Sequence, residues 1–440
     1  MRRVLRSWWP LAGSWVFMGL ELPVVSAVMA RLAEPEISLA AYGGVVFPLS
    51  MIIEAPIIML LTASTALSRD WASFRFLRRF MFRIGLVLTL LHVALAFTPL
   101  YDLVVAGLIR PPPEVLGPAR LGLMIMTPWT WSIAYRRFHQ GVLIRFGRSH
   151  LVGVGTMIRL AANVVALTVG YLARESVPGI AVGAAAVACG VVAEAVFIGI
   201  VVRPVLRERV RPAAPAEPLR WGAFIAFYTP LALTSLLMLS AGPMVSAAVS
   251  RLPRALDSLA VWPVINGLGF TMRSLGLAFN EVVVALLDEP GARRTLRRFA
   301  WWLAGATSAA LFLIALTPLA KLYFRTLASL SPELSELAAS AILIAALMPG
   351  FGALQSWSQG ILVHTRRTRG VTEAVVVYLL ASVLVLALGL RHGRIVGVYV
   401  GLCAVVFGTA CQLLWLWGRS RRALREWLRA SADPGAMADS

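Results

Sequence analysis

The stretch Ser258–Leu287, SLAVWPVINGLGFTMRSLGLAFNEVVVALL, is almost wholly apolar and about 30 residues long. Because about 20 apolar residues suffice for a helix to cross the hydrocarbon core of a bilayer, this stretch predicts a transmembrane helix. Arg273 lies at its middle. On a helix, Asn266, Arg273 and Asn280 share one face because they are seven residues apart, and Glu281 lies at the edge of that face.

A guanidinium at the depth predicted for Arg273 cannot be neutralised by losing its proton. It must therefore be paired, hydrated or in contact with a ligand. Two interpretations remain open. Arg273 is either a structural residue bonded to carbonyl groups or a carboxylate inside the helix bundle, or a charge that faces a water-filled substrate path.

The composition of the chain is typical of a polytopic membrane protein. Of the 440 residues, 59% are hydrophobic and 14% are charged, and the mean hydropathy is +0.79. Lys and Arg number 41 against 21 Asp and Glu, but the Arg clusters fall between apolar runs, as the positive-inside rule predicts, so we expect no nucleic-acid partner. The three cysteines have neither metal-ligand spacing nor a disulfide framework, and we expect no metal and no cofactor.

Hydropathy predicts an all-α protein with about twelve transmembrane helices embedded in the lipid bilayer. The expected spans lie near residues 9–32, 38–67, 79–100, 117–138, 150–172, 178–202, 222–252, 258–287, 298–319, 333–354, 371–390 and 394–417.

The loops between these spans alternate between Arg-rich and Arg-poor. The Arg-rich set includes both termini and the segment Arg203–Arg220. The positive-inside rule assigns this set to the cytoplasm. We therefore predict a multi-pass protein of the inner (plasma) membrane of a prokaryote, with both termini cytoplasmic.

The two halves of the chain resemble each other at a nearly constant offset in residue number. PVVSAVMARL (Pro23–Leu32) matches PMVSAAVSRL (Pro243–Leu252) at an offset of 220. The motifs RRF, TPL and QG begin at Arg78, Thr98 and Gln140 and recur at an offset of 219, beginning at Arg297, Thr317 and Gln359. Each half holds six spans, so the halves are parallel repeats. In such transporters the substrate site lies near the bilayer midplane between the halves.

The segment Arg203–Arg220, RPVLRERVRPAAPAEPLR, is rich in Pro, Ala and charge, which is typical of a linker. We therefore expect an N-terminal six-helix lobe (1–205), a cytoplasmic linker (206–220), a C-terminal six-helix lobe (221–418) and a basic, then polar, cytoplasmic tail (419–440).

Several motifs look like those of a known transporter family: LAAYG (Leu39–Gly43), SRD (Ser68–Asp70), AYRRFHQGVLIRFGRSHLVG (Ala134–Gly153) and FYTPLAL (Phe227–Leu233). With its two lobes, the chain resembles the exporter superfamily that includes the MATE transporters, and within it the progressive ankylosis protein family. At Glu54–Pro56 it has EAP where that family has TGP. The resemblance implies a MATE-like fold and export of a small anionic metabolite such as pyrophosphate, citrate or a nucleotide, or of a drug on the broader MATE pattern.

The repeat places Glu54, in the second span, opposite Arg273 or Ser274 in the other half. The two halves thus present opposite charges at one depth. If both residues face the central cleft, they could pair when the cleft is empty and separate when an anion binds Arg273. A static structural ion pair is the alternative.

Glu21 lies near the middle of the first span. A desolvated carboxylate there suits a proton relay or a cation site. The resemblance to MATE transporters implies that Glu21 couples transport to protons or sodium. Structural hydrogen bonding by a protonated Glu21 is the alternative.

Two further helices present polar or aromatic residues that could line a cleft. Arg159 and Asn163 share a face of the fifth span, and Glu194 in the sixth span could pair with Arg159, which otherwise would snorkel to the cytoplasmic end. Trp131 and Tyr135 stack on the fourth span, where they either line the cleft or belong to an interfacial aromatic belt.

The sequence contains no signature of an ATPase, a metalloprotease or a serine hydrolase, so we predict no catalytic residues. We expect a secondary transporter that works by alternating access. Arg273 would hold the anion, Asn266 and Asn280 would donate hydrogen bonds, and Glu54 would be the competing counter-charge. The alternatives are a MATE-type cation-coupled multidrug exporter and a flippase of lipid-linked sugars.

The predicted orientation can be tested by labelling intact cells. Tags at either terminus should be protected from an impermeant reagent, because the Arg-rich loops face the cytoplasm. A tag in the Arg-poor loop near Arg391 should react and serves as the control. A carboxyl-terminal tag that is labelled from outside would contradict the orientation.

Overall fold

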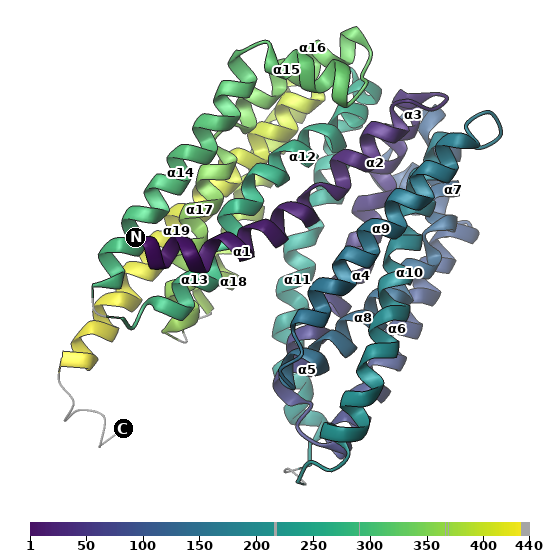
Figure 1. The fold of residues 1–440 in the computed structure, drawn as a ribbon. Coiled ribbons are helices and arrows are strands. Elements are labelled where there is room, and N and C mark those ends of the chain that lie inside the picture. The colour runs from purple at the N-terminus through teal and green to yellow at the C-terminus, as the bar shows by residue number, and fades with distance from the viewer. Residues whose placement is uncertain (215–217, 290, 366, 368, 433–440) are drawn as a thin grey trace. The chain divides into compact units, whose positions relative to one another are not determined.

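The computed structural model describes residues 1–440 apart from 215–217, 290, 366, 368 and 433–440. Every element in the described residues is helical (Figure 1), which confirms the predicted all-α class. The chain divides into two compact units. We call Val24–Pro263 the Glu54 unit, and Met1–Pro23 together with Val264–Ser440 the Arg273 unit, after a charged residue inside each.

Two helices cross the boundaries between the units: α2 (Glu21–Met29) and α12 (Ala255–Leu277). The other helices of the Glu54 unit are α3 (Pro35–Ala40), η1 (Ala41–Val46), α4 (Phe47–Ile58), α5 (Leu60–Leu67), α6 (Trp71–Phe97), η2 (Asp102–Ile109), α7 (Pro113–Ile125), α8 (Thr127–Arg145), α9 (His150–Leu172), α10 (Gly179–Val205), η3 (Leu206–Val210) and α11 (Trp221–Val249). Those of the Arg273 unit are α1 (Arg2–Gly19), α13 (Phe279–Leu286), α14 (Ala292–Leu316), α15 (Leu319–Lys321), η4 (Leu322–Leu327), α16 (Pro332–Ala345), α17 (Met348–His364), α18 (Arg369–His392) and α19 (Gly397–Ala432).

Ten helical segments in the described residues are long and apolar enough to cross a membrane. They correspond to ten of the predicted spans, and the predicted span 150–172 coincides with α9. The two other predicted spans, 117–138 and 258–287, correspond to α7 with α8 and to α12 with α13. Each of these two is interrupted, at Met126 and at Ala278.

The first predicted span, 9–32, is not one unbroken helix, because α1 and α2 are separated at Leu20. Pro23 has no N–H to donate to the carbonyl of Gly19 four residues earlier. The hydroxyl of Thr271 donates to that carbonyl instead, at 3.0 Å. A side chain from α12 thereby satisfies the backbone oxygen that the proline leaves without a donor.

Hydroxyl groups also satisfy carbonyls beside two other prolines. Pro128 cannot donate to the carbonyl of Met124, and the Thr127 hydroxyl donates to it at 2.9 Å. Near the end of α4, the Tyr228 hydroxyl donates to the carbonyl of Pro56 at 2.5 Å. The interruptions thus leave few backbone oxygens without donors, as an apolar surrounding requires.

Unusual backbone conformations recur at the same offset of 219 to 220 residues as the sequence motifs. Four described residues other than glycine have positive φ: Glu34 (48°), Arg110 (56°), Arg254 (54°) and Ser329 (54°). An offset of 220 relates Glu34 to Arg254, and an offset of 219 relates Arg110 to Ser329. A left-handed residue with a Cβ atom is energetically unfavourable, so its recurrence at equivalent positions supports the internal repeat independently of sequence identity.

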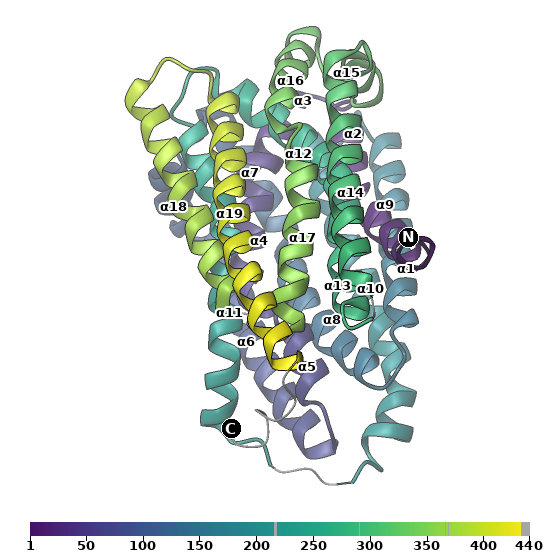
Figure 2. The ribbon, with the colours of Figure 1, turned by 90° about the vertical axis from the view of Figure 1, so that its left-hand side faces the viewer.

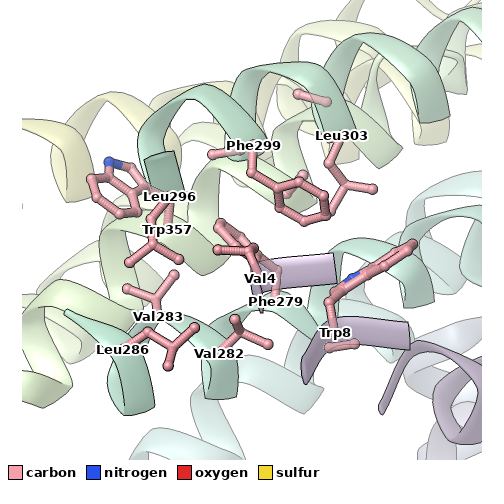
Figure 3. Packing of buried hydrophobic residues seen from close by; sticks show 14 of the residues in the cluster. Val4, Trp8, Phe279, Val282, Val283, Leu286, Leu296, Phe299, Leu303 and Trp357 are labelled. Carbon is pink, nitrogen blue, oxygen red and sulfur yellow. The ribbon is translucent and has the colours of Figure 1, made fainter. Parts of the chain in front are cut away.

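Each unit contains the helix that begins the other half of the sequence. In the Glu54 unit, α11 packs against α4, and the ring of Tyr228 lies 4.8 Å from that of Phe80. In the Arg273 unit, α1 packs against α13 and α14, and the ring of Trp8 lies 5.5 Å from that of Phe299 (Figure 3). The repeat relates Phe80 to Phe299 at an offset of 219, and Trp8 to Tyr228 at an offset of 220. The same aromatic contact therefore occurs in both units, with the first helix of each half exchanged.

The exchange explains why the compact units divide the chain at Pro23 and Pro263. The predicted lobes 1–205 and 221–418 follow the sequence repeat, whereas the units follow packing. The helices α14, α17 and α19 of the Arg273 unit pack in that order and run side by side in Figure 2. A buried cluster that includes Val4, Phe299 and Trp357 joins α1, α13, α14 and α17 (Figure 3).

Candidate functional site

Glu54 is buried on α4, with 3% of its surface exposed. The indole Nε1 of Trp129, on α8, donates to its Oε2 at 2.5 Å. Pro56 follows two residues later, and its carbonyl accepts the hydrogen bond from Tyr228. The carboxylate of Glu54 is therefore held at the junction of α4, α8 and α11 inside its own unit.

A second buried carboxylate, Glu194 on α10, connects three helices. It is 0% exposed. The Nη1 of Arg136 donates to its Oε2 at 2.7 Å, and the Nε2 of Gln140 donates to its Oε1 at 2.9 Å. The Nε of Arg159, on α9, lies 3.9 Å from Oε2. Glu194 thus anchors α8 and α9 to α10 by charge-assisted contacts.

Arg137 adds a third guanidinium to this region. It interacts electrostatically with Glu54, Glu194, Arg136 and Arg159. Its Nε is buried and has no hydrogen-bond partner in the described residues. We call Glu54, Glu194 and the three arginines the ion cluster. With three guanidinium groups against two carboxylates, the ion cluster has an excess of one positive charge when all members are ionised.

The ion cluster is closely packed. A Cβ atom at Gly190, on α10, would collide with the Oδ1 of Asn163 and would lie 3.0 Å from the carbonyl of Arg159. Only glycine at this position allows α9 and α10 to approach so closely. Asn163 is itself buried on α9, one turn from Arg159.

Arg273 lies in the other unit, and the described residues around it include no acidic partner. Its guanidinium is 5.6 Å from the ring centroid of Phe270 and interacts electrostatically with Tyr378. A Cβ atom at Gly352, on α17, would lie 2.7 Å from its Cγ, so the aliphatic stem packs directly on that helix. In the part of the chain that the structure describes, no carboxylate forms an ion pair or hydrogen bond with Arg273.

The repeat relates the surroundings of Arg273 to the ion cluster. At an offset of 219, Arg136 corresponds to Gln355, Arg159 to Tyr378 and Asn163 to Ser382. Gln355, on α17, donates through Nε2 to the Oε1 of Gln412 at 3.0 Å. Ser382 donates to the carbonyl of Ala404 at 3.1 Å. Equivalent positions therefore form a charged network in the Glu54 unit and a neutral one in the Arg273 unit.

The other residues predicted on the face of Arg273 differ in exposure. Asn266 and Asn280 are half-buried, whereas Glu281 is exposed. The Oδ1 of Asn280 is buried and has no hydrogen-bond partner in the described residues. Because α12 ends at Leu277 and Asn280 belongs to α13, the uninterrupted helical face that the spacing predicted is divided at this point.

The remaining candidate residues occupy varied environments. Glu21 is the first residue of α2 and is half-buried at the interruption after α1. Trp131 packs on the exposed Phe82, with ring centroids 5.4 Å apart. Tyr135 stacks near His139, at 4.2 Å between centroids. In the described residues, no group of three or more His, Cys, Asp or Glu is arranged to hold a metal ion.

Sequence reasoning did not identify Arg136 and Arg137 as candidate site residues. Both lie within α8, and Arg136 is 5% exposed. The helical spacing contained a signal, because Trp129, Arg136 and Gln140 recur at intervals of seven and four and therefore share a face. The predicted span 117–138 contains both arginines, and α8 continues beyond it to Arg145.

The chain is similar to several solved transporters. One is an inward-facing multidrug resistance MATE family transporter of the MOP superfamily, with a TM-score of 0.68 and 16% identity over 93% of this chain and 96% of that one. Another is the lipid II flippase MurJ in an inward closed conformation, with a TM-score of 0.69 and 13% identity over 93% of this chain and 87% of that one. A third is a Vibrio cholerae MATE transporter, with a TM-score of 0.64 and 18% identity over 97% of both chains.

No protein-family model and no curated protein sequence matches the chain. At these low identities the similar structures establish the fold alone. They cover nearly the whole chain, so the predicted MATE-like fold is confirmed.

The stability of the Glu54 unit should depend on Glu194. Glu194→Ala leaves the buried Arg136 without its carboxylate, which we expect to lower the free energy of unfolding by about 3–5 kcal/mol. Replacing both partners, with Glu194→Leu and Arg136→Met, should recover much of that loss because no buried charge remains unpaired in this contact. Thermal unfolding of the purified protein in detergent measures both effects.

Asp257→Ala is the matched control, because the pair of Asp257 with Arg254 is considerably more exposed. This change should alter the unfolding temperature little. A Glu194→Ala protein that unfolds at the same temperature as the Asp257→Ala protein would contradict the structural importance of Glu194.

Proposed function

We propose that this protein is a secondary transporter that moves a small anionic metabolite outward across the membrane by alternating access. The observation that supports an anion is the environment of Arg273. Arg273 is half-buried, packs on Phe270 and Gly352, and has no carboxylate partner in the described residues. Because a guanidinium stays charged, such a group favours an anionic ligand.

Two features support the details of this proposal. The amide oxygen of Asn280 is buried without a partner in the described residues, and turning the amide over would direct its NH2 group, which has two donors, toward an anion. Asn266 is also half-buried on α12, one heptad before Arg273. We assign hydrogen-bond donation to both amides. The resemblance to the progressive ankylosis proteins supports pyrophosphate, citrate or a nucleotide as the class of anion.

In this proposal Glu54 is the counter-charge that competes with the anion. Glu54 and Arg273 belong to different units, so their pairing stays a prediction from the repeat. The hydrogen bond from Trp129 fixes the position of the Glu54 carboxyl group inside its own unit. Glu21, at the interruption between α1 and α2, is the residue to which we assign coupling by protons or sodium.

Two other functions remain as alternatives. A MATE-type exporter would use Glu21 and Glu54 to attract organic cations, and a flippase would move a lipid-linked sugar, as the similarity to MurJ suggests. A further similar structure is a MOP superfamily transporter from Pyrococcus furiosus. The polarity of its binding pocket is reversed, and this reversal suggests a different function for that protein. The polarity of the pocket therefore differs among proteins with this fold, and the charge of the substrate is the property that distinguishes the three functions.

Binding measurements on the purified protein test the anion proposal. Arg273→Ala should raise the Kd of the preferred anion about 10- to 100-fold, because a hydrogen bond to a charged group contributes roughly 1.5–3 kcal/mol. Pyrophosphate, citrate and a nucleotide are compared with an organic cation. Glu54→Gln should bind the anion as well or better but transport it more slowly.

Arg391→Ala is the control, because Arg391 is exposed at the end of α18 in the same unit. Normal anion affinity in Arg273→Ala would refute the role of Arg273. Binding of the organic cation alone would favour the multidrug exporter instead.

Coupling through Glu21 requires a separate experiment in vesicles. Glu21→Gln should abolish accumulation driven by an ion gradient and leave substrate binding unchanged, because the neutral amide cannot exchange a proton or hold a cation. Glu36→Gln, in the short α3 helix, is a control of the same chemistry. Full gradient-driven uptake by Glu21→Gln would exclude the coupling role.

A further inference from the structure

A groove of about 760 Å³ lies between α14, α17 and α19 of the Arg273 unit. These helices pack on one another in Figure 2, and the groove lies where α14 begins and α19 approaches its end. Four arginines line it: Arg293 and Arg297 from α14, and Arg421 and Arg425 from α19. The residues of each pair are four apart, so both members of a pair lie on the same helix face.

The described part of the chain does not compensate the positive charge of this groove. Within it, no Asp or Glu lines the groove and none of the four arginines forms an ion pair. Arginines nearby are paired, as Arg419 is with Glu373 and Arg367 with Glu426. The guanidinium of Arg421 lies 3.5 Å from the ring centroid of Trp417, which restricts its orientation.

The walls of the groove are apolar and suit a hydrocarbon chain. Trp301 and Leu414 line it and are 61% and 64% exposed. Its floor is rigid, because Trp357 and Ile361 belong to the buried cluster shown in Figure 3, where Trp357 lies beside Leu296. An occupant would therefore meet charge at one part of the groove and apolar surface at another.

A buried hydroxyl on α17 provides an independent indication of a polar ligand. Ser358 lines the groove and is 1% exposed, yet its Oγ has no hydrogen-bond partner in the described residues. A buried hydroxyl without a partner is unfavourable, and native proteins normally satisfy such groups. An acceptor oxygen of a ligand in the groove would satisfy Ser358.

We infer that this groove binds an anionic phospholipid whose headgroup carries two phosphates, of the diphosphatidylglycerol type. Each pair of arginines would bind one phosphate, since guanidinium groups match phosphate oxygens in bidentate geometry. Trp301 and Leu414 would contact the acyl chains. Basic pockets between transmembrane helices bind such headgroups at the cytoplasmic side, which is where the Arg distribution predicts these helix ends to lie.

The test uses the full chain in nanodiscs of phosphatidylcholine with increasing diphosphatidylglycerol, and native mass spectrometry to count retained lipid. The double variant Arg421→Gln/Arg425→Gln should bind diphosphatidylglycerol at least 10-fold more weakly than the unaltered protein. Ser358→Ala should weaken binding several-fold. The matched control is Arg422→Gln, an exposed neighbour on α19 that does not line the groove.

Other outcomes would overturn the inference. These are equal retention of diphosphatidylglycerol and phosphatidylcholine, unchanged retention by the double variant, or an equal loss in Arg422→Gln. Inorganic pyrophosphate distinguishes a lipid from a free anion, and displacement of the lipid by low concentrations of pyrophosphate would also overturn it. Thermal unfolding of each variant in detergent verifies that it is folded before binding is compared.

Discussion

The structure depends on one constraint: polar groups inside the helical bundles must be satisfied by the protein, because a bilayer interior supplies no water. The contact of Arg136 with Glu194 shows the consequence most directly. Glu194 is fully buried, and its two oxygens accept from Arg136 and Gln140 while Arg159 lies close by. Such a network contributes little net stability relative to an apolar core, but removing one member leaves an uncompensated buried charge. It therefore fixes how α8, α9 and α10 pack.

The same constraint determines how the helices are interrupted. Proline removes a backbone donor, and the Thr271 hydroxyl replaces the one that Pro23 cannot give to Gly19, while the Tyr228 hydroxyl donates to the carbonyl of Pro56 near the end of α4. The donors come from helices distant in sequence, so each interruption is also a tertiary contact. Glu21 begins the helix after one interruption, and Glu54 lies two residues before the proline of another. Two of the residues proposed for transport, Glu21 and Glu54, therefore lie beside interruptions of helices, as is common at membrane transport sites.

The two halves of the sequence share backbone features but differ in the charge of side chains at equivalent positions. Positive-φ residues and aromatic contacts recur at offsets of 219 to 220. At equivalent positions, however, Arg136 is replaced by Gln355 and Arg159 by Tyr378. The result is a paired ion cluster in one unit and, in the other, an Arg273 that has no carboxylate partner among the described residues. This difference in charge is the basis on which we propose an anion as the substrate, since a repeated fold by itself indicates no substrate.

The sequence by itself determined the fold class, the approximate positions of the spans and the repeat, because these follow from hydropathy and motif spacing. The span 150–172 coincides with α9 for that reason. It also identified Glu54 as a polar residue deep in an apolar run, and this residue is buried. Only the tertiary structure decided the partners of the buried polar residues. The bond of Trp129 to Glu54 joins residues 75 positions apart, and that of Arg136 to Glu194 joins residues 58 apart. The exchange of α1 and α11 between the units likewise has no local signal, because contacts between distant helices depend on packing rather than on periodicity.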